Sequence, residues 1–127
     1  LDWKLRGDPR IVVRENVNAR YLTPDIVPDR CDLATFDVSF ISVTKIFPAI
    51  PPLLQPEAEL VILVKPQFEV GREDVGRGGI VRDPALHEQA CRKVAAAVAE
   101  LGYKAEWMGS PILGAEGNRE FLLHGRR

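Results

Sequence analysis

Cysteine is scarce in this 127-residue chain, which has only Cys31 and Cys91. Two thiols so far apart match neither the ligand spacing of a zinc site nor a disulfide framework, so we expect no metal and two small buried thiols. Long hydrophobic runs are also missing: no stretch approaches the roughly 18 apolar residues that span a bilayer, and no signal-peptide pattern opens the chain. We therefore expect a cytoplasmic protein that does not enter membranes.

The chain has no surplus of either charge. Seventeen Lys and Arg residues against eighteen Asp and Glu give a formal net charge of −1. This composition lacks the overall basic field of a nucleic-acid-binding domain, so any affinity for RNA must be local or come from another part of the protein. The 46% of hydrophobic and 28% of charged residues that are present are ordinary for one domain with a single core. Because the first residue is Leu1, we expect a piece of a longer protein.

The most informative stretch is residues 60–70, LVILVKPQFEV. Residues 61–64 are apolar without polar alternation, which is typical of a strand covered on both faces in a parallel sheet, although a short buried helix fits this pattern too. Pro66 disfavours a helix that continues through it and biases Lys65 towards an extended backbone. We therefore expect a strand over residues 60–65, with the Lys65 ammonium at its carboxyl end, where open α/β sheets place their ligand crevice.

The N-terminal part predicts shorter elements. Residues 1–6 are typical of the last turns of a helix that Gly7 stops. Residues 11–13, IVV, predict a short strand, and residues 23–30, with two prolines, predict a connecting loop or helical turn.

A further strand is predicted from Cys31 to Asp37, which places the Asp37 carboxylate at the tip of that strand. Ser42 can cap a helix over residues 43–54. Three prolines lie within that helix, so we expect it to be kinked or broken.

The second half predicts a long helix between two strands. Residues 71–82 contain four glycines among alternating charges and predict a flexible loop. Asp83 and Pro84 then cap a helix with apolar residues at spacings of three or four, and Gly102 stops it. Residues 104–108 predict an outer strand and residues 121–123 a closing one. The alternation of strands and helices predicts an α/β fold with a mostly parallel sheet, and the short last connection predicts an antiparallel final strand.

Two predicted strand tips carry residues of opposite charge. Asp37 and Lys65 are separated by one strand–helix–strand unit, and a right-handed crossover makes such strands neighbours, so their side chains could meet in one crevice. On spacing alone, a structural ion pair is the favoured explanation, ahead of a catalytic site. Glu120, beside a turn, has the ordinary explanation of a solvated carboxylate. The glycine-rich segment matches neither phosphate-binding motif.

Five segments run in order through nearly the whole chain: NARYL (18–22), DVSFIS (37–42), VKPQFEVGRE (64–73), GRGGIVRDPALH (76–87) and GNREFLL (117–123). Together they closely resemble the hemolysin A (TlyA) family of ribosomal RNA methyltransferases. That family joins an S4-type RNA-binding domain to an FtsJ-like, S-adenosylmethionine-dependent domain with a Rossmann-like fold, and it methylates ribose 2′-hydroxyls of ribosomal RNA. The resemblance implies that residues 1–127 are the C-terminal part of the FtsJ-like domain.

FtsJ-like enzymes use a Lys-Asp-Lys-Glu set, and the resemblance places Asp37, Lys65 and Glu120 at its last three positions. The first lysine, the cofactor-binding glycine loop and the acidic residue that holds the cofactor ribose have no counterpart in this chain. By analogy with the class, Asn18 is the best candidate to lie near the adenine of S-adenosylmethionine, although a turn-forming asparagine is an equally good explanation.

These residue types suit the reaction that the resemblance implies. A ribose hydroxyl is a poor nucleophile that must be aimed at the methyl group and relieved of its proton. A lysine acts as a base only when neutral, and an adjacent ionised carboxylate favours the ammonium instead. We therefore expect Lys65 to orient the hydroxyl and stabilise its developing charge, Asp37 to fix Lys65, and Glu120 to help to place the ribose or the missing lysine.

The missing first strands have a structural consequence. In the family's sheet they lie between the strand at residues 11–13 and the strand that ends at Asp37, so two facing edges lose their partners. We expect the chain either to repack its first segment or to form a homodimer through the vacated edge, and to bind S-adenosylmethionine poorly. Two other functions remain open: an RNA-binding module without enzyme activity, and a membrane-active hemolysin.

Overall fold

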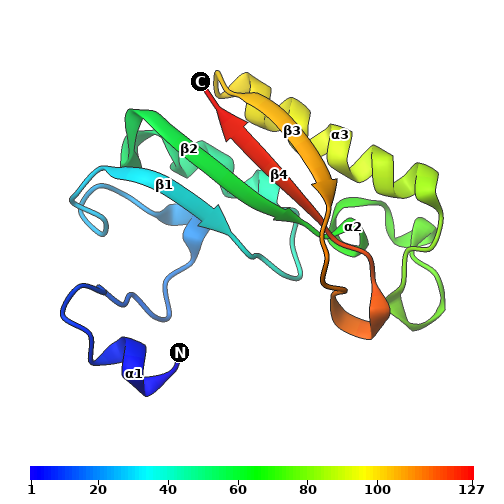
Figure 1. Cartoon of the computed structure of the whole chain (residues 1–127), viewed down its shortest axis with the longest axis horizontal. Coiled ribbons are helices and arrows are strands. Elements are labelled where there is room, and N and C mark those ends of the chain that lie inside the picture. Colours follow the sequence, from blue (N-terminus) through cyan, green and yellow to red (C-terminus); the bar gives the residue numbers. More distant parts are fainter.

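A computed structural model describes residues 1–127 and shows one four-stranded sheet with a long helix packed against it (Figure 1). The sheet has the order β1-β2-β4-β3. Its strands are β1 (Cys31–Phe36), β2 (Leu54–Val64), β3 (Lys104–Gly109) and β4 (Phe121–Arg126). β1 pairs with β2 in parallel, whereas β4 is antiparallel to both β2 and β3. Three strands therefore point one way and the final strand the other, which confirms the predicted α/β fold class.

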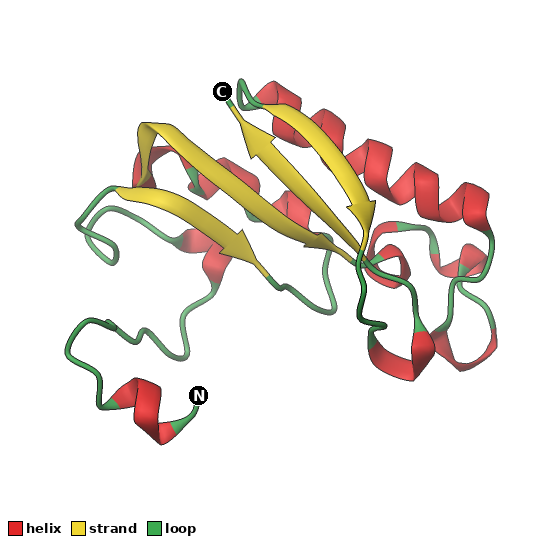
Figure 2. Ribbon diagram, viewed as in Figure 1, coloured by secondary structure: helices red, strands yellow, loops and turns green.

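The long helix α3 (Pro84–Glu100) begins and ends as its sequence predicts. The Asp83 carboxylate accepts a hydrogen bond from the Ala85 N–H at 2.9 Å, and Pro84 occupies the first helical position. Gly102, with φ +94°, lets the chain turn out of the helix at its other end. One side of α3 is buried against the sheet (Figure 2). The buried residues of the helix are His87, Ala90, Cys91, Val94 and Val98.

Burial affects the reactivity of Cys91 on this helix. Loss of solvation, with a smaller effect from the Glu88 carboxylate, raises the pKa of the Cys91 thiol to about 11. At pH 8 only about one thiol in a thousand is then ionised, so a Cys31→Ala variant should react slowly with a disulfide reagent until urea unfolds it or the pH passes 11. The matched Cys91→Ala variant keeps the half-buried Cys31. Equally fast reaction of the two folded variants would contradict the expectation.

The predicted helix over residues 43–54 is broken, as its prolines indicate. It consists of three short 3-10 helices: η2 (Val43–Lys45), η3 (Phe47–Ala49) and η4 (Pro51–Leu53). The Ser42 hydroxyl caps the first of them by accepting the Thr44 N–H at 3.2 Å. Phe47 packs edge-on against Phe36 of β1, with ring centroids 5.7 Å apart. These turns thus bury apolar side chains in the same core as α3.

Only one face of the sheet is covered. Along β2 the even-numbered residues Ala58, Leu60, Ile62 and Val64 are buried, whereas the odd-numbered residues alternate with them at half or full exposure. The expectation that residues 61–64 are covered on both faces is therefore wrong for this chain. On the other face, Leu33 and Met108 are 54% and 61% exposed. No helix of residues 1–127 packs on that face, because α3 and the 3-10 turns share the opposite one.

The first thirty residues lie beside the sheet and add no strand to it (Figure 1). Helix α1 (Trp3–Arg6) ends at Gly7 as predicted, and the 3-10 helix η1 (Ala19–Tyr21) follows later. The predicted strand over residues 11–13 is wrong: the segment joins no ladder and Val12 is 71% exposed. A strand needs a partner edge, and no neighbouring strand lies beside this segment. Ala19, Leu22 and Val27 do pack against the core.

The glycine-rich segment forms two short turns and is fixed at its end. The turns are η5 (Arg72–Asp74) and η6 (Arg77–Gly79), and η7 (Ala115–Gly117) precedes β4. A short helix, α2 (Pro66–Glu69), leads into this segment from β2. Asn118 is 2% exposed; its Oδ1 accepts the Val81 N–H at 3.0 Å and its Nδ2 donates to the Gly79 carbonyl at 2.9 Å. The glycine-rich segment is therefore tied to the turn that leads into β4.

Candidate active site

The ends of β1 and β2 bring Asp37 and Lys65 together. Parallel pairing aligns Phe36 with Ile62, so the residues that follow both strands emerge at the same edge of the sheet. Lys65 Nζ lies 2.6 Å from Asp37 Oδ1, which confirms that the two side chains meet. The Lys65 side chain is 13% exposed, whereas the Asp37 side chain is 74% exposed. The lysine side chain is therefore largely shielded from solvent, whereas the carboxylate that it contacts faces solvent.

The ammonium of Lys65 retains donor capacity. It donates to Ser39 Oγ at 3.1 Å in addition to its ion pair with Asp37. Since an ammonium has three N–H groups, these two partners leave one without a protein acceptor. The backbone of Lys65 is extended, with φ −113° and ψ 97°, as the following proline predicts. Pro66 starts α2 and is buried, so the base of the lysine side chain is anchored.

Glu120 lies just before β4 and beside the end of β2. Val64 pairs with Phe121, so Lys65 and Glu120 occupy the next position of the same register, beyond the last paired residues. Glu120 is only 7% exposed, so the expectation of a solvated carboxylate is wrong. Its carboxylate makes no ion pair with Lys65 and instead packs over Gly114, where a side chain would collide with it. The structure thus brings Glu120 to the site without direct contact with the ammonium.

Asn18 has a local role in the structure. It is exposed, and its Oδ1 accepts the Arg20 N–H at 3.0 Å, which caps η1. The turn-forming explanation of this residue is therefore what the geometry shows, and contact with a cofactor stays a prediction.

Two phenylalanines beside the ion pair were not predicted as site residues. Phe40, three residues after Asp37, is 86% exposed and adopts φ +72°. Its ring lies 5.4 Å from that of Phe68, three residues after Lys65. A positive φ in a bulky residue costs about 1–3 kcal/mol and clusters at functional sites. The only sequence signal was an aromatic residue in a loop that follows a charged strand tip.

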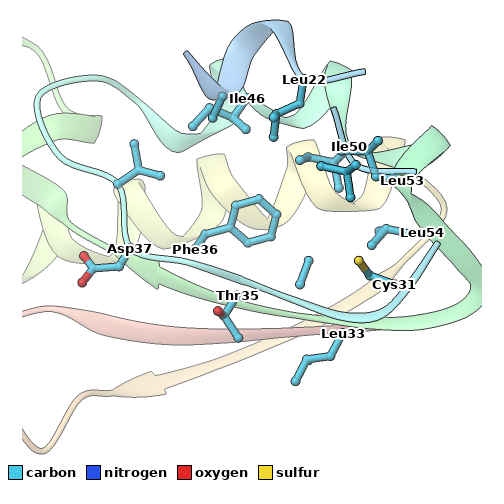
Figure 3. A pocket seen from close by; sticks show the side chains of 14 residues that line it. Leu22, Cys31, Leu33, Thr35, Phe36, Asp37, Ile46, Ile50, Leu53 and Leu54 are labelled. Atoms are coloured by element: carbon cyan, nitrogen blue, oxygen red, sulfur yellow. The ribbon is translucent and has the colours of Figure 1, made fainter. Parts of the chain in front are cut away.

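An apolar groove of about 380 Å³ follows the unpaired edge of β1 and ends at Asp37 (Figure 3). Phe36 points into this groove, while Leu33 lies on the opposite face of the strand. The groove is lined mainly by aliphatic side chains from η1, the 3-10 turns and β1. S-adenosylmethionine carries a ribose diol, an amino group and a carboxylate, for which this lining provides little beyond Asp37. The lining of this groove therefore does not by itself suit that cofactor.

Comparison with known proteins identifies the family. A model of FtsJ-like methyltransferases matches residues 1–127. The chain belongs to the FtsJ-like methyltransferase family. It is 46% identical over 124 residues to the 16S/23S rRNA (cytidine-2′-O)-methyltransferase TlyA of Mycobacterium tuberculosis (strain ATCC 25618 / H37Rv), covering 97% of this chain and 46% of TlyA. It is 41% identical over 126 residues to Hemolysin A of Brachyspira hyodysenteriae, covering 98% of this chain and 52% of that protein.

Solved structures of this family have the same fold. A protein from Streptococcus thermophilus that is named as a hemolysin matches with a TM-score of 0.93 and 43% identity, over 100% of this chain and 46% of that one. A Lactococcus lactis protein, also named as a hemolysin, matches with a TM-score of 0.92 and 42% identity, over 98% and 61% of the two chains.

This FtsJ-like chain spans about half the length of the curated relatives that it matches. The activities named for the full-length relatives can therefore only be proposed for this chain. None of its helices has both the length and the apolar character that crossing a bilayer would need.

Proposed function

We propose that this chain is the C-terminal part of an S-adenosylmethionine-dependent methyltransferase that transfers a methyl group to a ribose 2′-hydroxyl of ribosomal RNA. The observation that carries the proposal is the Lys65–Asp37 pair, which holds an ammonium with an unused N–H at the carboxyl edge of the sheet. The name of the Mycobacterium tuberculosis relative supports the substrate class. An rRNA substrate would place the protein in the cytoplasm, with ribosomal RNA or ribosomal subunits as its partner.

Each site residue has a distinct part in this reaction. The remaining N–H of Lys65 orients the hydroxyl and stabilises the negative charge that develops on its oxygen. Asp37 fixes the ammonium, because a charged hydrogen bond of 2.6 Å restricts the flexible lysine side chain. Glu120, fixed over Gly114, helps to place the ribose. Bound S-adenosylmethionine supplies the methyl group, and the region that the relatives have in addition completes its site.

The exposed ring of Phe40 suits an RNA substrate. Single-stranded or flipped bases bind proteins by stacking on aromatic rings, which requires a ring open to solvent. Phe40 is such a ring, and it lies in the loop that begins at Asp37. A base stacked there would lie on the loop that carries Asp37 and Ser39, the two partners of Lys65. Since the chain has a net charge of −1, most of the affinity for the phosphate backbone comes from another part of the protein.

A methylation assay tests this function. The longer protein that contains residues 1–127 is incubated with unmodified ribosomal subunits and S-adenosylmethionine carrying a labelled methyl group, and digested RNA is analysed by mass spectrometry. We expect a labelled methyl group on ribose. Label on a base would contradict the proposal, and rRNA binding without any transfer would favour the non-enzymatic RNA-binding module.

Residues 1–127 alone should bind S-adenosylmethionine weakly or not at all, because the groove along β1 provides few polar partners for it. Titration calorimetry measures this, with the longer protein as the positive control. The same edge of β1 has no partner strand, so the isolated chain should also self-associate, which sedimentation over a range of concentrations detects. Tight cofactor binding, or a monomer at all concentrations with a sharp melting transition, would contradict these expectations.

Gly114→Ala tests the place of Glu120. The glycine has φ −85°, which alanine tolerates, but its added Cβ would displace the Glu120 carboxylate. We expect methyl transfer to fall about tenfold, in line with the cost of a misplaced active-site group, with little loss of stability. The matched control is Gly7→Ala, whose Cβ would meet only the Trp3 carbonyl oxygen at 3.6 Å. Unchanged transfer in Gly114→Ala would remove Glu120 from the site.

A further inference from the structure

Two short loops of the candidate site are joined at three places. The first is residues 37–43, which lead from β1 into η2, and the second is residues 65–69, which consist of Lys65 and the single turn of α2. The ion pair of Asp37 with Lys65 joins them at one end, and the rings of Phe40 and Phe68 meet in the middle. At the other end, the carboxylate of Glu69 reaches the first loop.

Glu69 holds that other end with both carboxylate oxygens. Its Oε1 accepts the Ser42 hydroxyl at 2.5 Å, and its Oε2 accepts the Val43 N–H at 2.9 Å. Its side chain is 2% exposed, so these bonds form away from water. Burial of a carboxylate costs free energy unless hydrogen bonds or a cation satisfy its oxygens. The fold therefore favours the arrangement in which Ser42 and Val43 bind Glu69.

The third partner of Glu69 comes from the long helix. Lys93 of α3 lies 3.1 Å from Glu69 Oε1 and donates to the Glu69 carbonyl oxygen at 3.0 Å. Helix α3 is packed on the sheet through its buried residues. Glu69 therefore ties both loops to the most regular part of the fold.

We infer that Glu69 is a positioning residue for methyl transfer, which holds the loop of Asp37, Ser39 and Phe40 against the loop of Lys65. This inference rests on the proposed function. Asp37 is 74% exposed and has no carboxylate hydrogen bond apart from its contact with Lys65, so its place depends on how its loop is anchored. The anchor at the far end is the pair of bonds from Ser42 and Val43 to Glu69.

Loss of this anchor should affect turnover more than substrate binding. In Glu69→Ala, the Val43 N–H and the Ser42 hydroxyl lose their buried acceptor, and the first loop can shift relative to Lys65. A displacement near 1 Å in a reacting site lowers rates by about 100-fold, so we expect kcat to fall about 10- to 100-fold. The KM for S-adenosylmethionine should stay within about twofold, because the Glu69 side chain is 2% exposed and bonded to protein partners, so it is not available to a ligand.

Glu69→Gln is the conservative variant. Its carboxamide oxygen can still accept the Val43 N–H, its amide N–H can donate to Ser42 Oγ, and only the charge opposite Lys93 is lost. Lys93 is 44% exposed and can be solvated instead. We expect Glu69→Gln to retain kcat within about threefold, because Glu69 positions the loop through hydrogen bonds that glutamine can also make. The matched control is Glu88→Ala, which removes an exposed carboxylate from α3 and should leave kcat unchanged.

The kinetic variants are made in the longer protein, and hydrogen exchange is measured on the same variants. In the parent protein the Val43 amide should exchange slowly, and in Glu69→Ala its protection should fall more than that of the amides within β2. If Glu69→Ala does not fold, Ser42→Ala removes the hydroxyl bond to Glu69, together with the cap on the Thr44 N–H, and should lower kcat about threefold or more.

The outcomes separate this inference from the proposed function. Loss of transfer in Lys65→Ala with normal kcat in Glu69→Ala would overturn the positioning role alone. Normal transfer in Lys65→Ala would overturn the proposed site itself, whatever Glu69 does. A fall in kcat for Glu69→Ala without any change in Val43 exchange, or an equal fall in Glu69→Gln, would also overturn the inference.

Discussion

Lys65→Ala in the longer methyltransferase should lower methyl transfer about 10²- to 10³-fold, the effect of removing a donor from a preorganised oxyanion site. The substitution removes the N–H that the structure leaves without a protein acceptor, and it leaves Asp37 without its cation. Binding of S-adenosylmethionine should stay within about twofold, because the role assigned to Lys65 is with the substrate hydroxyl and not with the cofactor. Single-turnover transfer to ribosomal subunits measures the first quantity and titration calorimetry the second.

Lys104→Ala is the matched control for this substitution, because Lys104 is exposed at the start of β3, away from the carboxyl end of β2. It should leave both rate and binding unchanged. Near-normal turnover in Lys65→Ala would end the assignment of this residue to the reaction, and the Asp37–Lys65 pair would then be a structural ion pair.

Ile62→Ala should destabilise residues 1–127 by about 2–5 kcal/mol, the usual cost of truncating a large aliphatic side chain in a core. Ile62 is fully buried near the carboxyl end of β2, paired with Phe36 on one side and Leu123 on the other. Since domains are stable by only about 5–15 kcal/mol, this change should remove a large part of the total. Urea denaturation followed by circular dichroism measures the free energy of unfolding.

The neighbouring residue provides the control for Ile62. Leu63 points to the uncovered face of the same strand, pairs with Leu122 and is half-buried. Leu63→Ala should cost roughly 1 kcal/mol in residues 1–127, because less apolar surface is lost from the interior. Equal losses for the two variants would contradict the one-sided core.

Local signals in the sequence predicted much of this fold. Asp83, Pro84 and Gly102 act on their own backbone neighbours, so the ends of α3 could be predicted without its environment. The broken segment that Ser42 caps followed in the same way from its prolines. Residues 11–13 show the limit of such signals, because a strand-forming sequence pairs only where an edge is beside it.

The sequence also indicated some residues of the candidate site and missed others. The sequence placed Asp37 and Lys65 at strand tips, since apolar runs end there and Pro66 follows. It left Asn18 open between a neighbour of the cofactor adenine and a turn residue, and the structure shows it as the cap of η1. It did not indicate that Glu120 is buried or that Phe40 is exposed with a positive φ, because both depend on contacts with segments far away in the chain.

By itself, then, the sequence determined the ends of α3, the break in the segment after Ser42 and the charged side chains that follow β1 and β2, because capping, proline geometry and periodicity act over a few residues. Only the tertiary structure decided that one face of the sheet is uncovered, that an N–H of Lys65 remains unused, and that Glu69 joins two loops. Those features depend on sheet register and on where α3 packs, which bring together atoms from segments more than twenty residues apart.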